Sequence, residues 1–188
     1  MNKGWRRARG EVVYFLNSDD ALFDAQVLER VAQAFEHDPA LDLLVGEVMY
    51  RHAGQRLVRR SYDHLDTAKL LFEDLCHQAV FARRSVFERI GGFNEAFRIN
   101  ADYDWLIRAF RSGAHVGSLS SPVATFSTGG AHTSDFDRLV AERQAVRLQY
   151  LSPLQLHLGL TWRRLANRLR RLSGRGPSGH FPLAPESR

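Results

Sequence analysis

The chain has 188 residues, of which 44% are hydrophobic and 25% are charged, as in soluble globular domains. Its single cysteine, Cys76, excludes an intrachain disulfide and is compatible with the cytoplasm. The sequence has no apolar run of about eighteen residues and no apolar secretory segment, so it predicts neither a transmembrane helix nor secretion.

The net charge of +5 comes from one end of the chain. Eight of the 26 basic residues, all arginines, lie between Arg143 and Pro185, a stretch without Asp or Glu. The other 18 basic residues are outnumbered by 21 acids. A nucleic-acid-binding fold would carry its basic face on the folded domain. The distribution instead favours a local contact between the C-terminal segment and an anionic surface.

The first half of the chain alternates predicted strands and helices. A helix ends near Gly10, and the apolar run 11–16 predicts a central strand covered on both faces. Strands are also predicted over 41–50 and 56–58, and a further helix is expected to begin at Asp66. The helix between the first two strands has apolar side chains at helical spacing, namely Val27, Leu28, Val31, Ala34 and Phe35.

The second half continues the alternation. It predicts a strand over 78–82, a short helix over 85–90 and a helix from 102 to 112. One or two short strands over 115–126 and a long helix over 134–151 follow. Alternating strands and helices indicate an α/β domain over residues 1–151, with a mainly parallel sheet flanked by helices.

Residues 152–173 predict a basic amphipathic helix, and 174–188 a disordered tail rich in Gly, Pro and Ser. One face of the helix carries Leu158, Trp162, Leu165, Leu169 and Leu172, and the arginines lie elsewhere around it. Two interpretations remain open. The helix packs on the domain with its arginines in solvent, or it lies on an anionic membrane surface with Trp162 near the headgroups.

Two adjacent carboxylates, Asp19 and Asp20, directly follow the first strand. In open α/β sheets, ligands bind beyond the carboxyl ends of the strands. A divalent metal that bridges phosphate oxygens would relieve the repulsion between the two acids. An ordinary turn is the alternative, because Asn17, Ser18 and Asp19 are all good turn residues.

A second acidic site is Asp102, in the stretch Asn100 to Trp105. Asp102 or Asn100 could cap the helix that follows. A carboxylate at a helix N-terminus beside a cleft is also a candidate general base.

Three segments resemble successive motifs of the family 2 glycosyltransferases, which have the GT-A fold. They are NKGWRRARGEVVYFLNSDD, CHQAVFARRSVFERIGGFNEAFRINADYDWLIRAFRSG and FSTGGAHTS, and together they cover about residues 2 to 135. The resemblance implies inverting transfer of a sugar from a nucleotide-diphosphate sugar to a hydroxyl acceptor. It also implies a cytoplasmic enzyme of cell-envelope polysaccharide synthesis, with a glycan or lipid-linked acceptor.

The resemblance assigns roles to individual residues. Ser18-Asp19-Asp20 is similar to the family's DxD-type motif. Asp20 would ligate Mg²⁺ or Mn²⁺ on the donor diphosphate, and Asp19 would contact the ribose or sugar. Asp102 would be the catalytic base, although Ala101 stands where the family often has Glu. The sugar and acceptor side would be formed by His77, Gln78, Gly91, Gly92 and Phe93. His132 is either a further metal contact or a surface-loop histidine.

The resemblance covers only the C-terminal two-thirds of a GT-A domain. Sixteen residues precede Asn17, enough for one helix but not for the family's nucleotide-binding strands. The chain is therefore expected to be a truncated form with weak or no activity alone, an exposed apolar edge at residues 11–16 and limited solubility.

Three other interpretations stay open. A non-catalytic remnant or interaction module would keep every motif, so only an assay separates it from an enzyme. A different metal-dependent phosphoryl- or nucleotidyl-transfer enzyme would use Asp19 and Asp20 and give Asp102 no role. A nucleic-acid-binding protein would depend on the arginine-rich end and bind in a salt-dependent way.

Overall fold

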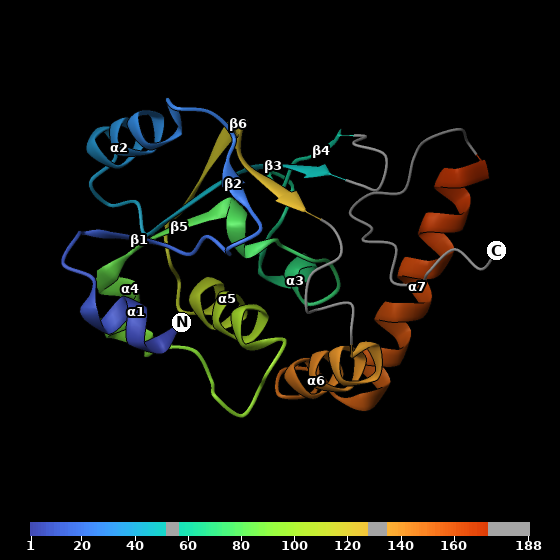
Figure 1. Cartoon of the computed structure of the whole chain (residues 1–188). Coiled ribbons are helices and arrows are strands. Elements are labelled where there is room, and N and C mark those ends of the chain that lie inside the picture. Colours follow the sequence, from blue (N-terminus) through green and yellow to red (C-terminus); the bar gives the residue numbers. More distant parts are fainter. Residues whose placement is uncertain (52–56, 128–134, 173–188) are drawn as a thin grey trace.

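The structure, a computed structural model, describes residues 1–51, 57–127 and 135–172. Figure 1 shows a single sheet flanked by helices. The strand order is β1-β5-β3-β6-β2, with β4 paired to β3 beside this path. The strands are β1 (Val12–Tyr14), β2 (Ala21–Leu22), β3 (Leu43–Arg51), β4 (Leu57–Arg60), β5 (Val80–Arg83) and β6 (Val116–Ser127).

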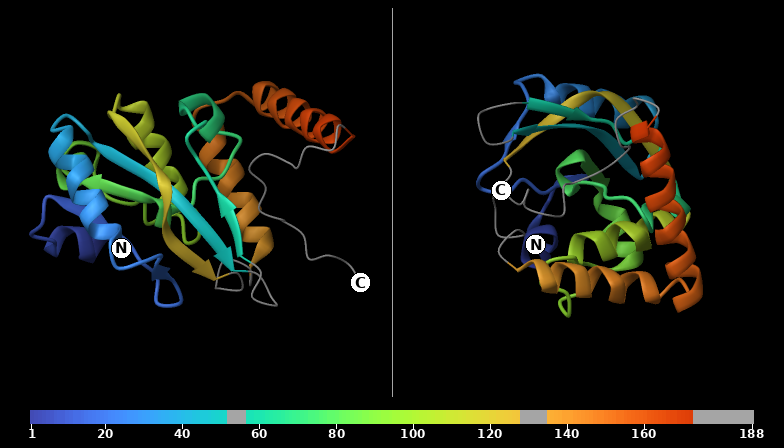
Figure 2. Two further views of the ribbon diagram at one scale, coloured as in Figure 1. Left: turned by 90° about the horizontal axis from the view of Figure 1, so that it is seen from above. Right: turned by 90° about the vertical axis from the view of Figure 1, so that its right-hand side faces the viewer.

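Helices cover both faces of the sheet. In Figures 1 and 2, α2 lies on one face, while α4 and α5 lie on the other. The helices are α1 (Asn2–Arg7), α2 (Val27–His37), α3 (Thr67–Leu70), the 3-10 helix η1 (His77–Ala79), α4 (Arg84–Ile90), α5 (Ala101–Arg111), α6 (Phe136–Leu148) and α7 (Pro153–Leu172). Because β3 is covered on both sides, seven of its first eight residues are buried, which explains its apolar run without alternation.

The predicted α/β class with flanking helices is confirmed, and the strand directions refine it. Only β3 and β6 run parallel; the other paired strands are antiparallel. The sheet is therefore mixed rather than mainly parallel. Parallel neighbours need a crossover of a dozen or more residues, usually a helix. Among the described residues, the connection between the parallel strands β3 and β6 includes α5 (Ala101–Arg111), whereas the one from β3 to its antiparallel neighbour β5 has only the four-residue α3 and the short η1 as helices.

The strand predicted to be central, residues 11–16, lies at an edge of the sheet instead. β1 ends the strand order and, within the described residues, pairs only with β5. Val13 is buried against the core, whereas Leu16 is exposed. The expectation of an apolar edge is confirmed, and the expectation of a strand covered on both faces is wrong.

Helix α7 forms the outer boundary of the described molecule, beyond α6 (Figure 2). It falls within the predicted segment 152–173, and the predicted tail 174–188 lies outside the described residues. The helix turns its predicted apolar face to solvent, because Leu158, Trp162 and Leu165 are all exposed. The helix does pack on the domain, but through its other side, where Leu156 and Asn167 are buried. No helix in the described parts of the chain is long and apolar enough to cross a membrane.

The close pairing of β3 with β6 requires a glycine at position 46. A Cβ at this position would overlap the side chain of Val123, which is fully buried on β6. Replacing Gly46 by Ala should lower the free energy of unfolding by about 1–3 kcal/mol through overpacking. Chemical denaturation measures this loss. Gly10→Ala is the control, because its Cβ would meet nothing closer than 3.6 Å and should change stability by less than about 0.5 kcal/mol. Equal stability of the two variants would contradict the packing described here.

Candidate functional site

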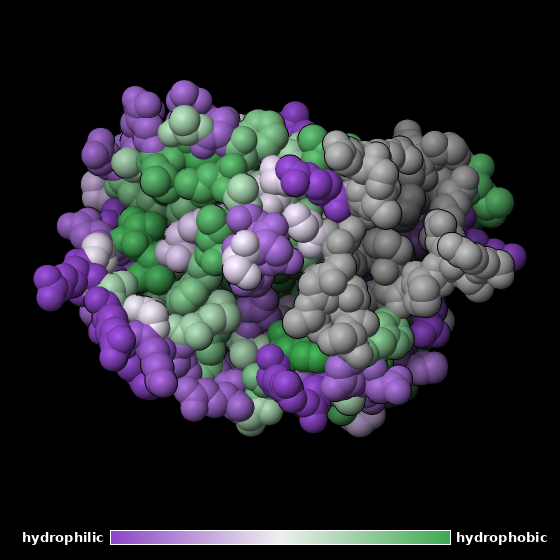
Figure 3. Space-filling model, viewed as in Figure 1, coloured by the Kyte–Doolittle hydropathy of each residue, from purple (hydrophilic) through white to green (hydrophobic). Residues whose placement is uncertain are grey.

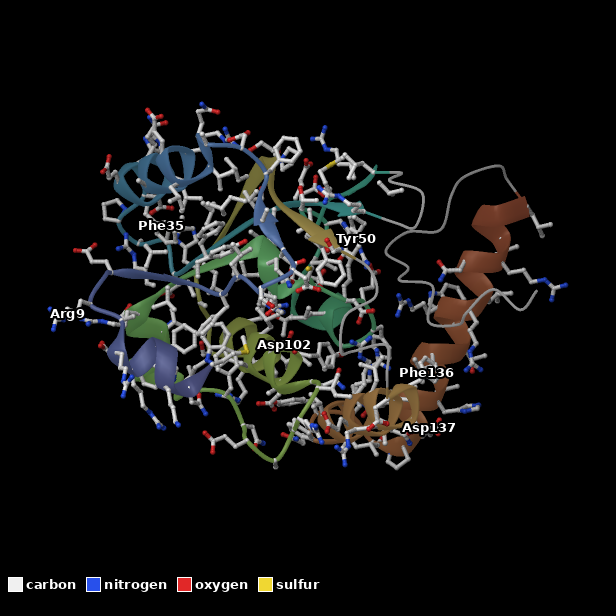
Figure 4. The ribbon with its side chains drawn as sticks, in the orientation of Figure 1. Arg9, Phe35, Tyr50, Asp102, Phe136 and Asp137 are labelled. Atoms are coloured by element: carbon white, nitrogen blue, oxygen red, sulfur yellow. The ribbon has the colours of Figure 1, made fainter. Side chains whose placement is uncertain are left out.

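A cavity of about 990 Å³ lies where three distant segments of the chain meet. The loop after β1, the segment 74–78 before β5 and the segment 98–102 leading into α5 all line it. Figure 4 shows Asp102 near the middle of the molecule, with Tyr50 from the sheet above it. The wall also includes Asn17, Ser18, Asp19, Tyr50, Phe126, Leu139 and Arg143. Two of the three motifs predicted to act together thus meet at one cavity; the third, FSTGGAHTS, is mostly outside the described residues.

Asp102 stands in the first turn of α5, and Glu142 of α6 holds this turn in place. The Glu142 carboxylate accepts backbone N–H bonds from Arg98, Ile99 and Asn100, at 2.8 to 3.0 Å. These groups precede the helix, where backbone donors lack helical partners. Burial works to raise the pKa of Glu142, but the three N–H bonds outweigh it and hold the pKa below its ordinary value. The contribution of Glu142 to stability is therefore present at neutral pH and is lost as the pH falls through the lowered pKa.

His77, at the start of η1, is the direct partner of Asp102. His77 Nδ1 lies 2.7 Å from Asp102 Oδ2, and the backbone N–H of Tyr103 donates to Asp102 Oδ1, also at 2.7 Å. The other ring nitrogen, His77 Nε2, is buried and has no hydrogen-bond partner among the described residues. A buried nitrogen of this kind is costly unless a ligand atom satisfies it.

The pKa of Asp102 lies below its ordinary value. Burial works to raise this pKa, but the hydrogen bond and charge of His77, the N–H of Tyr103 and the charge of Arg143 together lower it. The helix N-terminus also favours a negative charge at this position. Asp102 is therefore ionised at neutral pH, which is the state that can accept a proton.

The two acids after β1 have different surroundings. Asp19 lines the cavity, whereas Asp20 is held by the protein. Gln78 Nε2 donates to Asp20 Oδ2 at 2.5 Å, and the backbone N–H of Ser127 donates to Oδ1 at 3.0 Å. Asp20 thereby joins the loop after β1 to the segment before β5 and to the end of β6.

Asp19 and Asp20 are the candidate ligands for a divalent metal. Among residues 1–51, 57–127 and 135–172, no three or more His, Cys, Asp and Glu side chains gather as a metal cluster. Mg²⁺ bound with a nucleotide diphosphate needs only one or two carboxylates, since phosphate oxygens and waters fill the other positions. Asp19 and Asp20 are the two carboxylates available for this. Asp19 lines the cavity; Asp20 does not, although each of its oxygens accepts one protein hydrogen bond and keeps acceptor capacity. His132, the other predicted ligand, lies outside the described residues.

The predicted acceptor residues Gly91, Gly92 and Phe93 do not line the cavity. Gly91 ends α4 with a φ of 78°, a conformation that favours glycine. The carbonyls of Gly91 and Gly92 accept hydrogen bonds from Trp105 and Arg108 of α5. Phe93 packs among aromatic rings of the core and lines a second, small pocket together with His77 and Asp102. The glycine motif therefore fixes α4 against α5 and contributes no side chain to the cavity wall.

Several residues of the site were not predicted from the sequence. They are Tyr50, Asp74, Arg98, Glu142 and Arg143. Arg143 donates to Asn100 Oδ1 and pairs with Asp74. Arg98 lies within the second resembling segment but was given no role there, and the other four belong to none of the three resembling segments and meet at the site only in the folded chain.

Part of the chain is similar to known proteins. Residues 1–91 match the model of the protein family described as Glycosyl transferase family 2. The resemblance to family 2 glycosyltransferases is confirmed. A PGL/p-HBAD biosynthesis glycosyltransferase of Mycobacterium bovis is 41% identical over 118 residues, which are 62% of this chain and 44% of that protein. The protein of the same description from Mycobacterium tuberculosis has the same identity and coverage.

An uncharacterized glycosyltransferase of Mycobacterium tuberculosis is 30% identical over 110 residues, which are 58% of this chain and 42% of that protein. The chain thus spans less than half the length of the curated relatives it matches.

The bond between His77 and Asp102 can be tested by titration. His77→Gln should raise the pKa of Asp102, because it removes the side-chain partner that lowers this pKa most. Carboxyl carbon NMR of the chain over the acid range measures the change. His64→Gln is the matched control, since His64 pairs with Glu73 near the surface and should leave Asp102 unchanged. An unaltered Asp102 titration in His77→Gln would show that the bond is not formed in solution.

Proposed function

We propose that the cavity is the site of an inverting glycosyltransferase, which moves a sugar from a nucleotide-diphosphate sugar to a hydroxyl acceptor. The observation that carries the proposal is the meeting of Asp19, Asp102 and His77 at one cavity wall from three separate segments. A strand-end carboxylate and an ionised carboxylate at a helix N-terminus are the two groups that the reaction needs.

Asp102 is the proposed catalytic base. Its carboxylate takes the proton from the acceptor hydroxyl while the hydroxyl oxygen attacks the anomeric carbon and the bond to the diphosphate breaks. Attack from the face opposite the leaving group inverts the anomeric centre. His77 holds Asp102 Oδ2 at 2.7 Å and so keeps the carboxylate oriented and ionised. Base catalysis of this type typically contributes about 10²- to 10⁴-fold.

The donor side is proposed to be formed by Ser18, Asp19 and Asp20. Asp19 is on the cavity wall, and Asp20 is fixed behind it by Gln78 and Ser127. Mg²⁺ or Mn²⁺ held by Asp20, with Asp19 beside it, would stabilise the negative charge of the departing diphosphate.

The acceptor side is proposed to include His77 and Gln78. The unpartnered His77 Nε2 supports this assignment, because a hydroxyl of the acceptor would supply the missing hydrogen bond. The acceptor class is a glycan or a lipid-linked glycan of the cell envelope. The proposed location is the cytoplasm, with peripheral contact at the inner face of the membrane, where a lipid-linked acceptor would be met.

A non-catalytic relative of these enzymes is the second candidate. One observation favours it: β1 leaves an unpaired apolar edge within the described residues. A non-catalytic relative would have weak activity, and so would an enzyme that needs the rest of a longer domain. In both cases the unpaired edge should limit the solubility of the chain alone. Tight donor binding by a monomeric, soluble chain would argue against the incomplete form.

The decisive substitution is Asp102→Asn. It should reduce release of nucleotide diphosphate from a panel of donors by at least about 10²-fold and leave donor binding intact, because the amide cannot accept the proton. Coupled turnover assays and calorimetric binding measure the two quantities. Asp137→Asn is the control, since Asp137 is exposed on α6 and lies away from Asp102 (Figure 4). Near-normal turnover in Asp102→Asn would remove this residue from the role.

A further inference from the structure

Helix α7 presents a continuous apolar stripe to solvent. We define the stripe by its six large side chains, whose exposed fractions run from 48% to 78%: Leu154, Leu158, Trp162, Leu165, Leu169 and Leu172. Their spacing follows the helical repeat, so they lie along one side of the helix. Trp162, at 73% exposed, is the largest of them.

The opposite side of α7 holds the helix on the protein. Leu156 and Asn167 are both buried there. At Gly159 a Cβ would overlap the ring of Phe72, so the glycine allows a close approach of α7 to the domain. The helix is therefore already docked, and the apolar stripe is the face that this docking leaves outside. In Figure 3, apolar atoms stand at the outer edge of α7.

The charged side chains of α7 itself are all basic. Arg164 and Arg168 are exposed, and α7 contains five arginines and no acid. The absence of acids extends in sequence from Arg143 to Pro185. An apolar face bordered by exposed arginines is complementary to a surface that is apolar inside and anionic outside.

We propose that α7 lies in the interface of an anionic lipid membrane, with the apolar stripe among the acyl chains and Arg164 and Arg168 at the headgroups. A second copy of the chain is a poorer occupant. Two α7 helices packed stripe to stripe would bring their arginines together, and α7 offers no carboxylate to neutralise them.

This inference deepens the proposed peripheral location and names the surface that makes the contact. It concerns lipid binding alone. Loss of sugar transfer in Asp102→Asn would therefore leave it intact, and failure to bind lipid would leave the proposed chemistry intact.

Vesicle sedimentation of the whole chain tests the proposal. The chain should sediment with phosphatidylcholine vesicles that contain phosphatidylglycerol, and much less with phosphatidylcholine alone. Arg164→Gln with Arg168→Gln should weaken binding to the anionic vesicles by roughly 25-fold, since each basic side chain near such a surface contributes about fivefold. Leu158→Gln with Trp162→Gln should abolish it. Neither pair should unfold the protein, because all four side chains are exposed.

Matched controls use exposed side chains elsewhere. Arg7→Gln on α1 and Leu28→Gln on α2 should bind as the unchanged chain does. Emission from Trp162 should shift to the blue on binding, and this shift should vanish in Trp162→Gln. Equal binding to neutral and anionic vesicles would overturn the proposal. The proposal would also be overturned if sedimentation velocity showed that the chain self-associates through the apolar stripe and the chain did not bind vesicles.

Discussion

The site depends on one buried amide. Gln78 is completely inaccessible to solvent, and its side chain donates to Asp20 Oδ2. Its other end accepts from the thiol of Cys76 at 2.7 Å. Burial raises the pKa of Cys76 to about 12, so this thiol stays protonated and remains a donor. The Tyr14 hydroxyl of β1 donates to the backbone carbonyl of Gln78. A buried polar group that loses its partner costs about 1–3 kcal/mol, which makes this network strongly selective for one arrangement.

The consequence is that two acids far apart in sequence are held in a fixed relation. Gln78 locates Asp20 and the loop that carries Asp19, and the adjacent residue, His77, locates Asp102. Glu142 then fixes the turn that precedes Asp102 from the other side. Asp20 and Asp102 are thus held by side chains from other segments of the chain, not from the segments that carry them. The arrangement resembles a pre-organised site, in which the chemistry rests on groups whose own positions are set by further hydrogen bonds.

The sequence was sufficient for the parts of the fold that follow local rules. The helical spacing of Val27, Val31 and Phe35 predicts the buried face of α2, and Asp66 does cap α3. The segment around Asp102 predicts a helix with the Asp102 carboxylate in its first turn, as α5 has it. Rules based on local sequence failed where contacts between distant segments decide the structure. Pro122 sits inside one long strand, β6, because the register shift opposite Glu47 accommodates it. The arginines and leucines of α7 do not reveal which side of the helix meets the domain, which the buried Leu156 and Asn167 show.

We propose that the cavity lined by Asp19 and Asp102 receives a metal–diphosphate complex. The most direct test is paramagnetic NMR of the chain with Mn²⁺ and a nucleotide diphosphate, compared with Mg²⁺ as the diamagnetic reference. Amide signals of residues 17–20, 76–78 and 98–102 should broaden together and first, since these segments line or support the same cavity. Uniform broadening over the whole surface, or selective broadening at any other group of residues, would contradict it.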